Sequence, residues 1–447
     1  MKAHEPVPAR LLRAARSLRP DRASGSRPVA EVLLPLVTSV LGERLPLRIE
    51  FWDGSGLGPE GGAGILRVNS PDAMRRILWA PGELGVARAF VAGDIDFDGP
   101  ILDVTHALNT TQTGGPRLRL GSLPLGIRTA AQLDLLSRAP APPKEEARPR
   151  GWRHSASRDA QAVTHHYDVG NDFYRLVLGD NMTYSCARFA QPEMTLDEAQ
   201  EAKIDLICRK LGLHESPGKQ LLDVGCGWGT MAIHAASRFG AHVLGITLSE
   251  PQAELGRKRA AEAGVSELVE VRVEDYRELR SSRQQFDAIS SIGMFEHVGK
   301  ARMATYFDTL AGLLRPQGRL LNHAISSIGG STLGRFSFVN RYVFPDGELI
   351  DVGEVVLAME RAGLEVRDVE SLREHYTRTL RAWVTNLERS WDEAVEIVGE
   401  ERARIWLLYM AASSNGFEDG GLGIHQVLGV RAEGGRSSMP PTRAEWG

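Results

Sequence analysis

The sequence predicts an α/β protein with a doubly wound, mostly parallel sheet and a smaller N-terminal α+β domain. Three observations lead to this fold class. Strand patterns alternate with helical patterns in the second half of the chain, as in repeated βαβ units. A glycine-rich loop directly follows the first of these strands. The length of 447 residues exceeds that of one ordinary domain, so we expect two folded parts joined by a linker.

Composition divides the chain into five segments. Residues 1–28 are rich in arginine, and residues 29–138 form the small α+β domain. Residues 139–154 are dominated by proline and charge, so we expect an extended and exposed linker. The second domain covers residues 155–434, and residues 435–447 form a polar tail.

The first segment repeats arginine at every third position from Arg10 to Arg19. Read as a helix, these arginines form one stripe. Two interpretations remain open: a solvated tail, or a basic amphipathic helix that rests on anionic lipid. The chain as a whole carries 53 basic and 57 acidic side chains, a formal charge of −4, so no nucleic acid partner is indicated.

Strands in the small domain are predicted at 47–52 and 65–68, because polar and apolar residues alternate there. Pro71 begins a helical pattern that runs through Leu78. The stretch 83–99 ends in aspartates at calcium-loop spacing, but the later glutamate of such a loop is missing. We therefore expect a plain turn there. The aspartates are Asp94, Asp96 and Asp98.

The second domain alternates strand and helix patterns. Helices are predicted between the strands, for example at Met231–Arg238 and Pro251–Ala263. In such sheets ligands bind outside the carboxyl ends of the strands. The predicted strands are Gln220–Val224, His242–Thr247, Val269–Val273, Phe286–Ile292 and Arg319–Ile325.

The loop after the first of these strands reads Asp223-x-Gly225-x-Gly227-x-Gly229. No Lys-Ser or Lys-Thr pair follows it, and the third glycine comes one residue too early for a dinucleotide fingerprint. A helix begins directly behind the loop, so its N-terminus can receive a carboxylate. A ligand with an amino-acid end and a nucleoside end suits this geometry, which predicts S-adenosylmethionine.

The next two strand ends carry groups that suit the same ligand. Thr247 and Gln252 follow the second strand and could bind a ribose or an amino-acid tail. Asp275 and Tyr276 follow the third strand, where an adenine could be recognised. Each feature is weak alone, but three consecutive strand ends agree.

Further residues that could carry chemistry are Glu296 after the fourth strand, His323 and Ile325 on the fifth, Cys186 and Tyr376. Taken singly, each has an ordinary interpretation: a buried thiol, a core histidine or a helix cap. The adjacent His165 and His166 are poorly spaced for a shared metal ion, so we expect no metal.

Taken together, these motifs resemble the cyclopropane-fatty-acyl-phospholipid synthase family. The resemblance rests on H-H-Y-D-V-G-N-D-F-Y, M-T-Y-S-C-A-R-F, L-D-V-G-C-G-W-G, G-M-F-E-H-V-G and H-Y-T-R-T-L, and covers residues 155–432. A weaker match, G-E-L-G-V-A-R-A-F-V-A-G-D-I-D, extends it into the N-terminal domain. The resemblance implies a class I, Rossmann-like methyltransferase fold.

The resemblance also implies the roles of individual residues. A bound bicarbonate would act as the general base that removes a proton from a carbocation. Its binding site would comprise Cys186, Glu296, His323, Ile325 and Tyr376. The implied S-adenosylmethionine contacts, together with those of the glycine loop, are Tyr184, Ser185, Asp223, Gly225, Gly227, Gly229, Thr247, Gln252, Asp275 and Tyr276.

The function expected from this resemblance is methyl transfer to the double bond of an unsaturated phospholipid acyl chain. The product is either a cyclopropane or a methylene-branched chain of the tuberculostearic type, and the latter would need a reductase partner. The alternatives are a methyltransferase for a soluble small molecule, and an inactive lipid- or cofactor-binding protein.

We expect the protein in the cytoplasm, peripherally bound at the inner face of the membrane, and leave open whether it forms a homo-oligomer. Its three cysteines are widely spaced, which favours a reducing compartment, and neither a signal peptide nor a membrane-spanning stretch is found.

Overall fold

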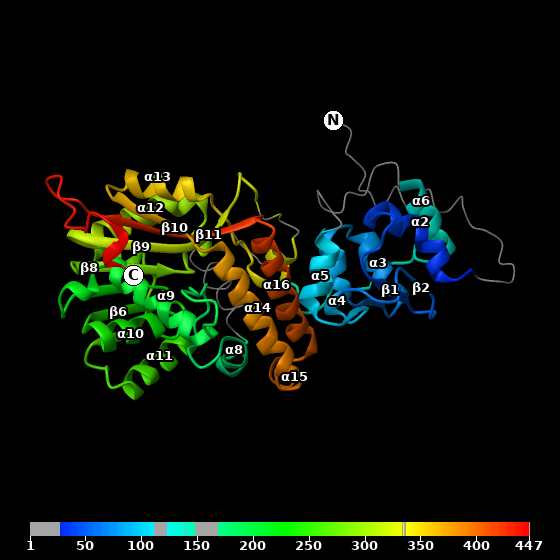
Figure 1. Cartoon of the computed structure of the whole chain (residues 1–447), viewed down its shortest axis with the longest axis horizontal. Coiled ribbons are helices and arrows are strands. Elements are labelled where there is room, and N and C mark those ends of the chain that lie inside the picture. The colour runs from blue at the N-terminus through cyan, green and yellow to red at the C-terminus, as the bar shows by residue number, and fades with distance from the viewer. Residues whose placement is uncertain are drawn as a thin grey trace. The chain divides into compact units, whose positions relative to one another are not determined.

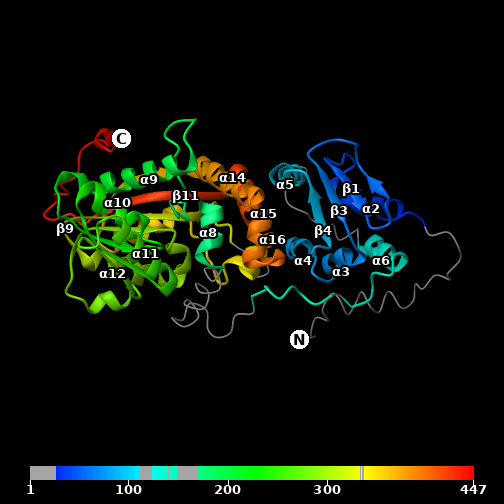
Figure 2. The same cartoon turned by 90° about the horizontal axis from the view of Figure 1, so that it is seen from below.

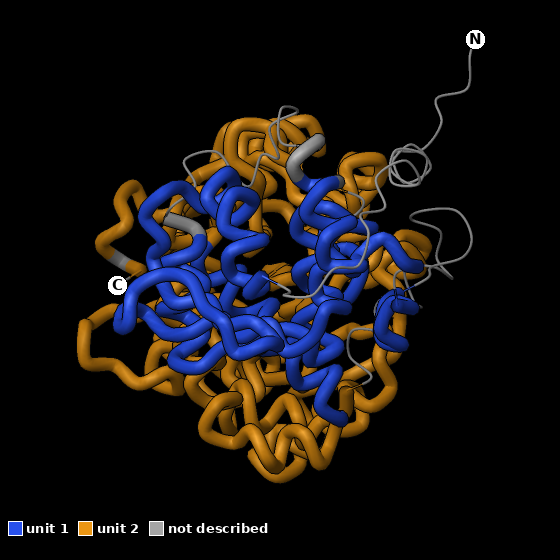
Figure 3. Tube along the Cα trace, turned by 90° about the vertical axis from the view of Figure 1, so that its right-hand side faces the viewer, with its two compact units in different colours: residues 1–147, 336–342, 399–415 blue, residues 148–335, 343–398, 416–447 orange. Residues whose placement is uncertain are grey.

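The computed structural model describes residues 27–110, 123–138, 140–147, 169–332, 334 and 337–446. The arginine stripe and the His165–His166 pair lie outside these residues. The chain forms two compact units (Figure 3). Unit 1 comprises residues 1–147, 336–342 and 399–415, and unit 2 comprises the rest. Two short pieces that the sequence assigned to the second domain thus belong to unit 1.

Unit 1 is built on a small mixed sheet with the strand order β2-β1-β3-β4. The pair β1–β3 is parallel, and the other neighbouring pairs are antiparallel. The strands are β1 (Arg48–Phe51), β2 (Gly56–Leu57), β3 (Ile65–Val68) and β4 (Ile95–Asp98). The accompanying helices are α2 (Val29–Leu41), α3 (Pro71–Trp79), α4 (Glu83–Val91), α5 (Ile101–Thr110) and α6 (Leu123–Gln132). The two strands and the helix predicted here are confirmed.

The turn predicted at Asp94, Asp96 and Asp98 is confirmed at Asp94, which lies in the turn before β4, but it is wrong at Asp96 and Asp98, which belong to strand β4. In the sequence I-D-F-D the apolar residues alternate with the aspartates, and Ile95 is buried. All three carboxylates are ion-paired within unit 1. The pairs are Asp94–Arg76 at 2.7 Å, Asp96–Arg404 at 3.1 Å and Asp98–Arg67 at 2.7 Å.

The predicted linker is not simply exposed, because Glu146 is buried within unit 1. Its carboxylate accepts hydrogen bonds from Arg88 at 2.7 and 2.8 Å and from Arg341 at 2.7 and 2.9 Å. Burial opposes ionisation of Glu146, but these hydrogen bonds outweigh it and lower the pKa of the carboxyl. The chain around residue 146 is therefore part of the folded unit.

The sheet of unit 2 has the order β10-β11-β9-β8-β5-β6-β7. The strands from β9 to β7 are parallel, whereas β11 is antiparallel to both β9 and β10. The strands are β5 (Gln220–Val224), β6 (His242–Thr247), β7 (Val269–Val273), β8 (Phe286–Ile292), β9 (Leu314–Ser327), β10 (Glu365–Ser371) and β11 (Leu422–Val430). The five predicted strands and the predicted fold class are confirmed, and β10 and β11 were missed.

Helices cover both faces of this sheet (Figures 1 and 2). Helices α9, α10 and α11 lie on one face, and α12 and α13 lie on the other. The helices of unit 2 are α8 (Asn171–Leu178), α9 (Leu196–Lys210), α10 (Thr230–Phe239), α11 (Glu250–Glu262), α12 (Met303–Leu313), α13 (Val352–Arg361), α14 (Arg373–Arg389) and α15 (Trp391–Val398). Helix α16 (Glu400–Glu418) begins in unit 1 and ends in unit 2.

Alternation along the strands decides which side chains face α9. Leu321 of β9 packs in the cluster that includes α9 and α10, whereas Leu320 packs in the cluster of α12 and α13. Since side chains alternate between the two faces, His323 and Ile325 lie on the same face as Leu321. The same holds for Asp223, two residues after Leu221, which also packs in the α9 cluster.

The last segment is more than a polar tail. Trp446 is buried and packs in the cluster with α9 and α10. Arg443 forms an ion pair with the buried Asp368 of β10. Residues after 434 therefore contribute to unit 2. Among the helices that the structure describes, none combines the length and apolar character needed to span a membrane.

Candidate active site

The glycine loop lies at the carboxyl end of β5, between β8 and β6, where the chain connections leave in opposite directions. Ligands of open α/β sheets bind at this switch point. Gly225 (φ +78°) and Gly227 (φ +54°) have left-handed backbones. A Cβ on Gly225 would lie 2.9 Å from Met294 Cβ, whereas one on Gly227 would meet open space. Gly225 therefore serves packing, and Gly227 leaves room for a ligand.

A cavity opens beside this loop. Gly225 and Gly227 line it, together with Thr247, Gln252, Asp275 and Tyr276. Thr247 Oγ1 donates to Gln252 Oε1 at 2.8 Å, which fixes the Gln252 amide in the cavity wall. The structure thus brings together six of the predicted cofactor contacts.

A second cavity adjoins the first, and Gly227 and Gln252 line both. Tyr184, Ser185 and Asp223 line only the second cavity of the two. A long ligand could therefore occupy both cavities by passing Gly227. Gly229 is the predicted cofactor residue that lines neither cavity. It precedes α10, and a Cβ there would lie 3.5 Å from Gly256 Cα, so it serves helix packing.

The second cavity has two buried charged residues in its wall, Asp223 and Lys203, and the sequence analysis did not identify Lys203. Lys203 of α9 is 1% exposed, and its Nζ donates to Ser185 Oγ at 2.9 Å. Burial lowers the pKa of Lys203 to about 8 and raises the pKa of Asp223 to about 6. Asp223 Oδ1 accepts from Ser290 at 2.7 Å, while its buried Oδ2 has no hydrogen-bond partner within the described ranges.

Aromatic rings join the second cavity to Tyr376 of α14. Tyr184 and Trp228 line the cavity, and the Tyr184 ring lies 5.3 Å from that of Trp383. Trp383 in turn lies 6.0 Å from Tyr376, which packs at 4.7 Å against Phe417. Faces of such rings attract cations within about 6 Å. The cluster could therefore stabilise positive charge that develops beside the cavity.

Glu296 lies in a short 3₁₀ turn, Phe295–His297, directly after β8. Its Oε1 accepts a hydrogen bond from the Ile325 N–H at 2.8 Å, and burial raises the pKa of its carboxyl to about 7. Its Oε2 is buried and lacks a hydrogen-bond partner among the residues described. The Ile325 N–H, which we expected to bind the ion, is occupied by Glu296 here. Glu296 is thus poised to share a proton at neutral pH.

Cys186 and Tyr376 meet at the start of α14. The Cys186 thiol lies 3.6 Å from the Leu372 carbonyl oxygen, which also accepts from the Tyr376 N–H at 3.0 Å. Burial raises the pKa of the Cys186 thiol, so it is protonated. The Leu372 N–H donates to the carbonyl of Ile424, the residue paired with Ile325. Main-chain contacts therefore bring the predicted ion-site residues together.

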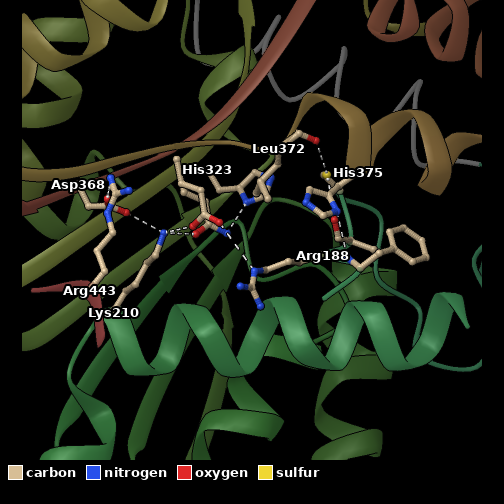
Figure 4. A network of polar contacts seen from close by, with 12 residues as sticks. Arg188, Lys210, His323, Asp368, Leu372, His375 and Arg443 are labelled. Carbon is tan, nitrogen blue, oxygen red and sulfur yellow. Dashed lines mark hydrogen bonds and ion pairs between the residues drawn. The ribbon is translucent and has the colours of Figure 1, made fainter. Parts of the chain in front are cut away.

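His323 belongs to a polar network on the same face of the sheet (Figure 4). Its Nδ1 lies 3.3 Å from Gln426 Nε2, and Gln426 Oε1 accepts from Lys210 at 3.0 Å. Burial and the ammonium groups of Lys203 and Lys210 lower the pKa of His323 well below its usual range. The ring is therefore neutral. Gln426 and Lys210 were not identified from the sequence.

The two parts of the site adjoin through strand β8. Ile292 lines the second cavity and is paired with His323, and Gly293 lines the first cavity and donates its N–H to the His323 carbonyl. Within the described part of the chain, no group of three or more His, Cys, Asp or Glu side chains is placed to hold a metal ion.

Comparison with known proteins shows a match to one family model and similarity to two fatty acid methyltransferases. The family model described as mycolic acid cyclopropane synthetase matches residues 154–427. The probable fatty acid methyltransferase Rv3720 of Mycobacterium tuberculosis is 42% identical over 410 residues, which cover 90% of this chain and 95% of the relative. The tuberculostearic acid methyltransferase UfaA1 of the same organism is 32% identical and covers 87% of this chain and 88% of its own length.

A solved structure agrees with the fold of unit 2. The mycolic acid cyclopropane synthase CmaA1, complexed with SAH and CTAB, aligns with a TM-score of 0.57 and 33% identity. The alignment covers 61% of this chain and 98% of that structure. The family resemblance read from the sequence motifs is confirmed by these comparisons.

Proposed function

The chain belongs to the mycolic acid cyclopropane synthetase family of S-adenosylmethionine-dependent methyltransferases acting on unsaturated acyl chains, and we propose that its acceptor is a phospholipid acyl chain. The observation that carries the proposal is the presence of two adjoining cavities together with buried polar atoms of Glu296 and His323 that have no hydrogen-bond partner among the described residues. The cavities suit a two-ended cofactor, and the polar atoms suit a small anion beside it.

The residues present fit S-adenosylmethionine, which supplies an electrophilic methyl group when bound. Thr247, Gln252, Asp275 and Tyr276 would hold its nucleoside end in the first cavity. In the second cavity, the Asp223 carboxylate would pair with the α-ammonium group and the Lys203 ammonium with the α-carboxylate. An alkene is a weak nucleophile, so this fixed orientation of the donor is the main requirement of the reaction.

The residues present also fit bicarbonate, which supplies a basic oxygen when bound. We propose that His323 donates to the anion and that Glu296 shares a proton with it, since a second full negative charge there would be repelled. Tyr376 and the rings behind it would stabilise the cationic substrate through their faces. Cys186 is a protonated thiol at the edge of this site and acts as a donor at most.

The proposal is tested by mass spectrometry of lipids. The purified protein is incubated with S-adenosylmethionine and vesicles of an oleoyl phospholipid, with and without bicarbonate. We expect a gain of one CH2 for each modified acyl chain, and a loss of activity when bicarbonate is removed. Intact cofactor binding without any mass gain would contradict the phospholipid acceptor and favour a soluble one. NMR of the product then distinguishes a ring from an exocyclic methylene group, and the latter implies a reductase partner.

We also propose that the protein works at the inner face of the membrane through its basic first segment. Each arginine near an anionic surface contributes about 1 kcal/mol, so four of them would give useful binding at low salt. The chain should co-sediment with anionic vesicles, and replacement of Arg10, Arg13, Arg16 and Arg19 by glutamine should release it. Equal sedimentation of both proteins would contradict this role.

A further inference from the structure

Three side chains from neighbouring strands form a row on the α9 face of the sheet. Gln426 of β11 is paired with His323 of β9 on one side and with Glu370 of β10 on the other. Directly paired residues of antiparallel strands point to the same face. His323 is 1% exposed and Gln426 is fully buried, so water does not compete for their hydrogen bonds.

Lys210 of α9 determines the orientation of the Gln426 amide through a hydrogen bond, and Figure 4 shows the polar contacts of this lysine. Its Nζ lies 3.0 Å from one end of that amide, 2.9 Å from Asp368 Oδ2 and 2.5 Å from Glu370 Oε2. The contacts with Gln426 and Glu370 are hydrogen bonds, and the contact with Asp368 is an ion pair. Because an ammonium can only donate, the amide end that faces it must be the oxygen. The amide nitrogen of Gln426 must then face His323.

This orientation determines the proton position on His323. The amide nitrogen of Gln426 donates to the nearest ring atom, Nδ1, at 3.3 Å. Nδ1 must therefore offer a lone pair, and a neutral ring then carries its proton on Nε2. Nε2 is buried and finds no hydrogen-bond partner in the part of the chain that the structure describes. The ring thus presents an unsatisfied N–H donor.

We propose that Gln426, held by Lys210, is a positioning residue that fixes His323 as the Nε2–H tautomer, so that this histidine donates to the bound anion. The inference rests on the proposed function only in naming that anion as bicarbonate. Its chemical consequence concerns the base. Since Nε2 already carries a proton, His323 cannot accept one from the substrate there, so another group must be the base.

The tautomer can be read directly in the full-length protein labelled with ¹⁵N-histidine. A His323→Gln variant identifies the signals of this ring among those of the other histidines. We expect a pyrrole-type Nε2 and a pyridine-type Nδ1 in the native protein without lipid. A pyridine-type Nε2, or an average of both forms, would overturn the inference.

A substitution that reverses the hydrogen bond tests the link to anion binding. In Gln426→Glu a carboxylate oxygen faces Nδ1, which must then carry the proton, so Nε2 becomes an acceptor that repels an anion. The loss of one charge-assisted hydrogen bond predicts a rise of about 10- to 100-fold in the KM for bicarbonate. The Kd of S-adenosylmethionine should change by less than about twofold. Gln426→Leu, which leaves Nδ1 without a donor, should populate both tautomers and give an intermediate rise.

Glu370→Gln is the matched control. It removes a charge beside Lys210 but keeps the Lys210–Gln426 contact, so the tautomer should stay unchanged. A Gln426→Glu protein with the native tautomer or an unchanged bicarbonate KM would refute the positioning role. If the native enzyme does not respond to bicarbonate, the proposed function fails, while the tautomer measurement still decides this inference.

Discussion

Glu296 illustrates at the scale of one residue how a reactive group can lower stability. Its carboxyl is buried, and its pKa is raised from 4.5 to about 7. Below pH 4.5 the folded and unfolded states are both protonated, so the raised pKa has no effect on stability. As the pH rises from 4.5 to about 7, the Glu296 carboxyl loses its proton in the unfolded state before it does so in the folded state. The free energy of unfolding therefore falls, by about 3 kcal/mol above pH 7.

We predict that Glu296→Gln inactivates the enzyme but stabilises it at alkaline pH. The variant should exceed the native protein in unfolding free energy by about 3 kcal/mol at pH 8, and by less than about 1 kcal/mol at pH 5. Urea unfolding followed by tryptophan fluorescence measures both values. Glu354→Gln, at a partly exposed ion pair with Lys300, is the control and should change little at either pH. A variant no more stable than the native protein at pH 8 would show that Glu296 ionises without penalty.

At the scale of elements, two glycines of the glycine loop have different roles, one in packing and one in ligand binding. Gly225 and Gly227 both have positive φ, but only a Cβ at Gly225 would collide with Met294. We predict that Gly225→Ala lowers the unfolding temperature more than Gly227→Ala does. Gly227→Ala should weaken S-adenosylmethionine binding by at least about tenfold, because its methyl group enters the space shared by both cavities. Thermal unfolding without ligand and calorimetric titration measure the two effects.

Gly218 offers a matched control for the backbone strain. It has φ +80°, a Cβ there would also meet open space, and it lies outside both cavities. Gly218→Ala should therefore cost about 1–2 kcal/mol of stability, as Gly227→Ala does, and leave cofactor affinity unchanged. Equal affinities of the Gly218→Ala and Gly227→Ala variants would argue against ligand contact at Gly227.

Helix α9 carries a buried polar stripe that serves both parts of the site. Gln200, Lys203 and Lys210 recur at helical spacing on one face, and each is about 1% exposed. Gln200 donates to the Thr183 and Ser185 carbonyl oxygens, at 3.3 and 2.8 Å, and so holds the segment that lines the second cavity. Lys203 faces that cavity, and Lys210, two turns later, faces Gln426.

Because we propose that Lys203 binds the α-carboxylate of the cofactor, we predict that cofactor affinity depends on this carboxylate. The native protein should bind decarboxylated S-adenosylmethionine about 10- to 100-fold more weakly than S-adenosylmethionine, because a charge-assisted hydrogen bond is lost. In Lys203→Met the two ligands should bind within about threefold of each other. Calorimetric titration measures all four affinities.

Two controls distinguish the loss of the Lys203 contact from a general loss of structure. Binding of 5′-methylthioadenosine, which lacks the whole amino-acid end, should be equal in the native and Lys203→Met proteins. Lys219→Met, at a partly exposed ion pair with Glu215, should keep the preference for the carboxylate. Persistence of that preference in Lys203→Met would rule out the assigned contact.

The elements that the sequence predicted best are the parallel strands β5 to β8, whose predicted and observed bounds coincide. Strands β5, β6 and β8 lie inside the sheet and are largely apolar, whereas β7 is an edge strand in which apolar and charged residues alternate. All four end at clear turn signals. Strands β10 and β11 were missed because Glu365, Arg367, Glu370, His425 and Gln426 interrupt the apolar pattern. Strand β4 was read as a turn because its aspartates suggested one, although their arginine partners lie elsewhere in unit 1.

The candidate site, like the fold, could be predicted only in part from the sequence. The cofactor contacts after β5, β6 and β7 could be predicted, since carboxyl ends of parallel strands meet at one edge. Lys203 and Lys210 could not, because a lysine on a helix ordinarily marks the solvated face. Their partners come from distant parts of the chain: Lys210 and Gln426 are 216 residues apart. Such pairings depend on the packing of α9 over the completed sheet.

At the scale of the whole molecule, the chain returns twice to unit 1 after completing its N-terminal part. Segments 336–342 and 399–415 belong to this unit, and each supplies partners to residues before 147. The Phe338 N–H donates to Glu83 at 3.0 Å, and Arg341 pairs with the buried Glu146. Unit 1 is therefore discontinuous in sequence, although its composition suggested a separate N-terminal domain.

We predict that a chain ending at residue 147 folds poorly on its own. It lacks Arg341 and Arg404, so Glu146 loses one of its two guanidinium partners and Asp96 loses an ion pair within unit 1. Removing one partner from a buried ion pair typically costs about 3–5 kcal/mol, a large part of the stability of a domain of this size. Thermal unfolding of this fragment, followed by circular dichroism, should show a broad transition at low temperature.

In the full-length chain, Arg341→Met should destabilise unit 1. The control Arg367→Met, at a more exposed pair with Glu365 of unit 2, should not. A fragment that unfolds as cooperatively as unit 1 does in the full-length chain would show that the returning segments add little.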